Sequence, residues 1–169
     1  MRFSHKGCTL IAVTSPVLRL PRTFIRYTDN HRVESLLLSN DTKGLEHLIN
    51  RLGPDVRVDG DKTLLMLSAE GNYLWTTNLL CAHHADVHAK DEKARTALHH
   101  AAIWGADDIA QTLLNAGATI DPQDHSGRTP LWYAAAKHYP DSAIVDVLLT
   151  AGANSKIRDS RGINPNDLL

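Results

Sequence analysis

"RTALHHAAIWG", residues 95–105, is the stretch that decides the fold. It places two adjacent histidines, His99 and His100, inside a run of small apolar residues. Such a pair is typical of a metal site or a proton shuttle, but also of a repeated turn and helix in which one histidine belongs to the scaffold. Related stretches elsewhere in the chain distinguish these interpretations.

Three similar stretches recur at a fixed spacing. Thr63, Thr96 and Thr129 are 33 residues apart and open "TLLMLSAEGN", "TALHHAAIWG" and "TPLWYAAAKH". Each is followed by a second apolar stretch, which comes two residues late in the third unit because of an insertion within 136–142. Threonine before an apolar run predicts a helix N-cap, and the spacing of the second stretch predicts an amphipathic helix. Each unit therefore reads as turn, helix, loop, helix and hairpin.

These motifs resemble the ankyrin repeat. Thr129-Pro130-Leu131, and Thr96-Ala97-Leu98-His99 with Ala101-Ala102, match the family's T-P-L-H-x-A-A motif. The resemblance implies an all-α solenoid of helix-turn-helix units with β-hairpin fingers, which stacks units of one supersecondary structure. We expect a basic arm over 1–30, a degenerate first repeat over 31–57, repeats over 58–90, 91–123 and 124–158, and a truncated repeat over 159–169. The hairpins are expected near 55–62, 86–95, 119–128 and 154–163.

The resemblance also assigns His99 to the scaffold. In the family this histidine hydrogen-bonds between neighbouring turns, and its counterparts here, Met66 and Trp132, do not form a matching ligand set. His100 lies one residue further on, as do Leu67 and Tyr133 in the other repeats, and we expect these bulky side chains to face the concave side.

A second cluster, "CAHHADVH", suggests a zinc site built from Cys81, His83, His84 and His88. The repeat alignment places Cys81 in the core, His84 where a helix-ending glycine is expected, and His88 on a hairpin. These directions diverge, so we expect no metal, no cofactor and no enzymatic activity. Use of this His/Cys cluster as a metal or catalytic site is kept as an alternative.

Composition limits the classes of partner. The formal net charge of −1 disfavours a general nucleic-acid or membrane-surface binder. Two cysteines, Cys8 and Cys81, form no disulfide framework, which favours a cytoplasmic protein. Residues 1–28 carry five basic side chains and no acid, so a secreted effector or an organelle-targeted protein remains an alternative.

The positions that the motif leaves free predict the function. They lie at the hairpin tips and at the concave end of each first helix, and they favour a monomer that binds another protein as an adaptor, inhibitor, immunity-type protein or effector. Trp104 and Ile103 have no core role by periodicity, and tryptophan is enriched at binding hot spots. Arg95 is expected to be an exposed tip. A fragment of a longer multidomain protein is a further alternative. The candidate binding residues are Trp104, Ile103, His100, Arg95, Lys93, Glu92, Tyr133, Lys137, Arg128 and His125.

Overall fold

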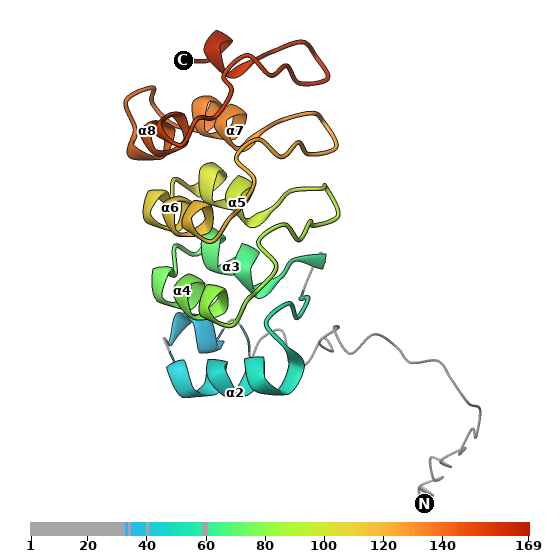
Figure 1. Ribbon diagram of the computed structural model, residues 1–169, viewed down its shortest axis with the longest axis vertical. Coiled ribbons are helices and arrows are strands. Elements are labelled where there is room, and N and C mark those ends of the chain that lie inside the picture. The colour runs from blue at the N-terminus through green and yellow to red at the C-terminus, as the bar shows by residue number, and fades with distance from the viewer. Residues whose placement is uncertain (1–32, 34, 40, 59–60) are drawn as a thin grey trace, which may run out of the picture.

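The computed structural model describes residues 33, 35–39, 41–58 and 61–169; the basic arm lies outside them. The described part is built from pairs of short helices joined by loops (Figure 1). Val33 and residues 35–38 are helical as well. The elements are α2 (Thr42–Leu52), α3 (Leu64–Glu70), α4 (Leu74–Ala82), α5 (Ala97–Trp104), α6 (Asp107–Asn115), α7 (Pro130–Lys137), α8 (Ala143–Thr150) and the 3₁₀ turn η2 (Pro165–Asp167).

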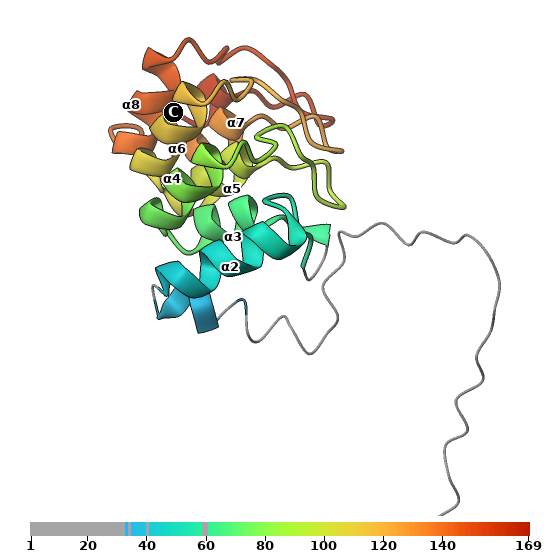
Figure 2. The ribbon, with the colours of Figure 1, turned by 60° about the horizontal axis from the view of Figure 1, so that its bottom comes forward.

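The helices form two layers. In the inner layer α5 packs between α3 and α7, and in the outer layer α6 packs between α4 and α8. Each inner helix also packs on the outer helix that follows it. Long loops project from the inner layer on the side away from the outer helices, and both views show them side by side (Figures 1 and 2). We call the loops over 85–96, 118–129 and 153–164 the second, third and fourth fingers. The predicted all-α solenoid is confirmed.

The inner helices begin where the threonines predict. The hydroxyl of Thr63 accepts a hydrogen bond from the backbone N–H of Met66 (3.3 Å), and that of Thr129 accepts one from Trp132 (3.2 Å). Pro130 occupies the first turn of α7, where its missing N–H costs no helical hydrogen bond. These caps satisfy donors that the first turn of a helix otherwise leaves unpaired.

The core lies between the layers. Leu64, Leu98 and Leu131 of the inner helices are fully buried, and so are Leu80 and its counterparts Leu113 and Leu148 in the outer helices. Each buried leucine contributes about 1.5–3 kcal/mol to folding. Cys81 was expected to lie in the core, but its side chain is only half-buried. It lies one residue after Leu80, so the helix turns it partly away from the core.

The outer helices end as predicted in left-handed backbone. Gly117 (φ 91°) and Gly152 (φ 92°) follow α6 and α8, whereas His84 (φ 58°) takes this position after α4. A side chain in this region carries a steric penalty that glycine avoids.

The fingers differ from the predicted β-hairpins. Apart from one isolated bridge between Arg57 and Thr63, the described residues form no β-strand pairing. Each finger is instead closed at its tip by two backbone hydrogen bonds, such as those from Asp91 N–H to the Arg95 carbonyl and from Ala94 N–H to the Asp91 carbonyl (both 2.9 Å). The physical reason is that aspartate side chains and neighbouring fingers take the hydrogen bonds that a strand ladder would use.

The last unit begins a further inner helix. Asn164 stands where Thr129 stands in the preceding repeat. Its Oδ1 accepts a hydrogen bond from the Asp167 N–H (3.2 Å), and its own backbone N–H donates to Oδ2 of Asp167 (3.0 Å). Pro165 is buried, and η2 packs on α7. This turn therefore covers part of α7. No helix in the described part of the chain is long and apolar enough to span a membrane.

Candidate functional site

Three buried aspartates shape the finger tips. Asp91, Asp124 and Asp159 each lie five residues before the residue that caps the next inner helix. Oδ1 of Asp91 accepts hydrogen bonds from the backbone N–H groups of Lys93 (2.8 Å) and Arg95 (2.9 Å). The other two aspartates repeat this pattern. Sequence reasoning missed them, although their spacing follows the repeat.

Neighbouring fingers are joined into one surface. The backbone N–H of His125 donates to the Lys93 carbonyl (3.0 Å), and that of Ser160 donates to the Ser126 carbonyl (2.9 Å) at the equivalent place one repeat later. Glu92, Lys93 and His125 are exposed at these tips, as predicted. The finger row therefore presents its side chains from a connected backbone.

His88 contributes to a similar link at the finger bases. Its ring Nδ1 lies 3.3 Å from the hydroxyl of Thr119 in the next finger. At the equivalent positions Asp55 accepts from the Asp86 N–H (2.7 Å) and Asp121 accepts from the Asn154 N–H. His88 thus occupies a structural position that acids fill in the other repeats.

His99 has the scaffold role that the resemblance implied. The N–H of Thr96 donates to its Nδ1 (3.0 Å), which assigns the ring proton to Nε2, and Nε2 donates to the Arg128 carbonyl in the third finger (3.1 Å). Burial lowers the pKa of His99 to about 4 and outweighs its hydrogen bond to the Arg128 carbonyl and the opposing charge of Asp124. The ring is therefore neutral at pH 7.

The prediction that His100 faces the concave surface is wrong. Its side chain is fully buried, with Nε2 3.1 Å from Oδ2 of Asp91 and Nδ1 2.9 Å from Oε1 of Glu70. The contact with Glu70 is close but lacks good hydrogen-bond alignment. Lys62 binds the same carboxylate (2.7 Å). Glu70 and Asp91 close over the imidazole from two neighbouring repeats, which helical periodicity alone could not show.

These contacts keep both carboxylates ionised. Burial alone would raise the pKa of Glu70, but His100 and Lys62 together lower it to about 2. Burial opposes ionisation of Asp91 as well, and the N–H groups and guanidinium of Arg95, together with Lys93 N–H, lower its pKa to about 2. Ionised carboxylates are the form that holds this network together.

Two more of the predicted binding residues are tied into the scaffold. Arg95 was expected to be a free tip, but its guanidinium lies 2.8 Å from Oδ2 of Asp91, and its side chain is mostly buried. The hydroxyl of Tyr133 donates to Oδ2 of Asp124 (2.7 Å), and its ring is half-buried. Both side chains hold the finger beside them, so little of either is free to contact a partner.

Trp104 is placed differently. It ends α5 with its side chain 60% exposed, beside half-buried Ile103, and Lys137 is exposed at the equivalent position of α7. The two-residue insertion packs on this end of α5 through His138, whose Nε2 lies 3.1 Å from the Ala102 carbonyl. Trp104 remains open to solvent beside that contact.

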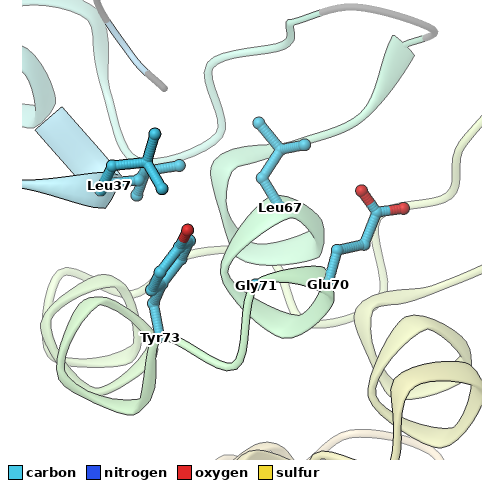
Figure 3. Close-up of a pocket in the computed structure, with 6 residues that line it drawn as sticks. Leu37, Leu67, Glu70, Gly71 and Tyr73 are labelled. Carbon is cyan, nitrogen blue, oxygen red and sulfur yellow. The ribbon is translucent and has the colours of Figure 1, made fainter. Parts of the chain in front are cut away.

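A hollow of about 300 Å³ lies near the first described helical turn (Figure 3). Leu37, Leu67 and Tyr73 are among its lining residues, and Leu38 beside it is 74% exposed. Among the residues that the structure describes, Glu70 is the only charged residue that lines it. The hollow therefore has apolar walls with one acidic edge.

Metal-ligating side chains do not converge in the part of the chain that the structure describes. No group of three or more His, Cys, Asp or Glu residues there is arranged to hold an ion. The suggested zinc set is dispersed: His84 follows the end of α4, and His88 reaches toward Thr119.

Comparison with known families agrees with this architecture. A family model described as ankyrin repeats in three copies matches residues 32–124 and, overlapping them, 65–159. The chain belongs to the ankyrin repeat family. No curated protein matches it. Ankyrin repeats generally act as protein–protein interaction modules.

Proposed function

We propose that this ankyrin protein binds a partner protein through its inner face, which we define as the finger tips and the exposed ends of α3, α5 and α7. One observation carries the proposal: Trp104 is 60% exposed on a helix whose residues from Ala97 to Ala102 are all buried. An exposed tryptophan with charged residues near it has the anatomy of an interface anchor. The charged and polar residues elsewhere on this face are Glu92, Lys93, His125 and Arg128 on the fingers and Lys137 at the equivalent end of α7.

We further propose that the protein is a monomeric, non-enzymatic adaptor or inhibitor of the cytoplasm. The balanced net charge supports a protein partner over nucleic acid or a membrane surface. The low cysteine count supports a reducing compartment.

The test is Trp104→Ala in the full chain, with Trp75→Ala as a matched control. Trp75 is 38% exposed on the outer helix α4, away from the inner face. Partners are captured from native lysate, identified, purified and measured by calorimetry. We expect Trp104→Ala to weaken binding by about 30-fold, equivalent to about 2 kcal/mol, and Trp75→Ala to leave it unchanged.

Thermal melts of both variants separate binding from folding. A melting temperature close to wild type for Trp104→Ala supports the anchor role. If that variant melts far below Trp75→Ala, or if it binds the partner as well as wild type does, the proposal fails.

A further inference from the structure

The fourth finger carries an excess of positive charge that the other fingers lack. Residues 154–163 contain three cations, Lys156, Arg158 and Arg161, against one acid, Asp159, which leaves a formal charge of +2. The second finger balances three cations with three acids over 86–95, and the third has one cation and two acids over 119–128. Positive charge therefore concentrates at one end of the finger row.

The single acid of this finger is turned inward. Oδ1 of Asp159 accepts hydrogen bonds from the backbone N–H groups of Arg161 (2.9 Å) and Ile163 (3.0 Å). Its Oδ2 lies 3.1 Å from the Arg161 guanidinium and 3.5 Å from Nε of Arg128 in the third finger. The carboxylate side chain is fully buried, whereas Lys156, Arg158 and Arg161 are exposed. A partner thus meets the cations and not the acid.

The ring of Trp132 holds Arg161 in place, together with Arg128 of the third finger. The guanidinium carbon of Arg128 lies 4.3 Å from the ring centroid of Trp132, and that of Arg161 lies 5.6 Å from it. Cation–π contacts of this kind restrict the guanidinium groups. Groups that are already restricted lose less conformational entropy when they bind a ligand. The Arg161 side chain nevertheless remains 55% exposed.

We propose that Arg128, Lys156, Arg158 and Arg161, the basic finger cluster, bind an acidic segment of a partner protein. This inference rests on the proposed function of the inner face and names the chemistry of its partner. Guanidinium groups pair with carboxylates in a bidentate geometry. Arg158 donates one N–H to the Gly162 carbonyl and Arg161 contacts Asp159, and both side chains remain exposed, with further guanidinium N–H groups to offer a ligand. A nucleic acid is the less suitable ligand, because its phosphates would extend from this cluster over the balanced and acidic fingers beside it.

The experiment titrates the ¹⁵N-labelled full chain with a short glutamate-rich peptide and follows backbone amide shifts by NMR. Shifts are expected at residues 156–163 and at Arg128, and the same peptide with glutamine in place of glutamate should not cause them. The double variant Arg158→Gln with Arg161→Gln should bind the peptide about tenfold more weakly. The control, Lys43→Gln with Arg51→Gln, removes two exposed cations from α2 and should bind as wild type does.

Several results would overturn the proposal. These are equal losses in the two double variants, shifts confined to residues 1–28, equal binding of the glutamine peptide, or tighter binding of a single-stranded oligonucleotide at the same amides. Unchanged amide spectra of the third and fourth fingers in the unliganded variants confirm that these fingers stay folded. Trp104→Ala should leave peptide affinity within about twofold, since Trp104 is outside the cluster. A failure of the anchor at Trp104 is therefore distinguishable from a failure of the basic finger cluster.

Discussion

The contact between α3 and α5 and the contact between α5 and α7 use equivalent positions with different chemistry. At the first joint His100 bonds Oδ2 of Asp91 (3.1 Å), and at the second Tyr133 bonds Oδ2 of Asp124 (2.7 Å). Glu70, which contacts His100, is replaced one repeat later by Ile103. The same backbone therefore accepts a histidine between two carboxylates or a tyrosine beside one, provided that the helix side chain still binds the finger aspartate.

The largest expected effect is on stability at the first joint. His100→Leu should cost about 3 kcal/mol of unfolding free energy, because Glu70 and Asp91 would each lose a buried partner. Lys62 and Arg95 stay paired with these carboxylates, which limits the cost of removing the imidazole. Urea unfolding measures the change.

A transplant of the second joint into the first provides the control. Glu70→Ile combined with His100→Tyr should recover most of the loss, because tyrosine can donate to Asp91 and isoleucine needs no partner. If the double variant is less stable than His100→Leu, the two joints are not interchangeable.

The second joint should carry a pH dependence through His99, which links α5 to the third finger. Its pKa falls from an unfolded value of 6.5 to about 4 in the folded protein. The unfolded chain therefore binds a proton in this window while the folded protein does not. Stability from this group is complete above pH 6.5 and is lost as pH falls toward 4. We expect a loss of about 2 kcal/mol between pH 7 and 5.

His99→Met is the matched variant for this measurement, because Met66 occupies the same position in α3. It should flatten the dependence of unfolding free energy on pH between 7 and 5. If the unfolding free energies of the wild type and the variant change equally with pH, His99 does not titrate as described. Glu70 and Asp91, with pKa values of about 2, contribute stability that is lost only as pH falls below their unfolded values of 4.5 and 3.8.

A smaller loss of unfolding free energy is expected at Tyr133. Tyr133→Phe removes only the hydroxyl that donates to Asp124, so we expect a loss of about 1.5 kcal/mol, typical of a hydrogen bond to a charged group. Asp124 keeps the backbone donors of Ser126 and Arg128, which limits the loss. Urea unfolding beside His100→Leu tests the order, and a larger cost for Tyr133→Phe would reverse the comparison.

The sequence predicted the solenoid because the 33-residue period determines caps, core positions and helix exits together. It also predicted the exposure of Trp104, since no core contact falls at that position of the repeat. It failed for His100 because the period gives the direction of a side chain but not which residues of the preceding repeat close over it. The prediction that Arg95 is an exposed tip failed because its partner Asp91 was not recognised. Asp91 belongs to a pattern of turn aspartates that is visible in the sequence only once the finger geometry is known.

The smallest expected effect compares the exits of α4 and α6, which lead into the fingers of the first and second joints. His84 (φ 58°) should be relieved of backbone strain by His84→Gly, with a gain of about 0.5–1 kcal/mol after the entropy cost of glycine. His83→Gly is the adjacent control: its φ of −88° already suits a side chain, so glycine there should destabilise. Gly117 shows that the scaffold accepts glycine at the equivalent exit of α6. Thermal unfolding of the two variants should therefore move in opposite directions, and a fall in melting temperature for His84→Gly would mean that the exposed imidazole makes a contribution larger than its strain.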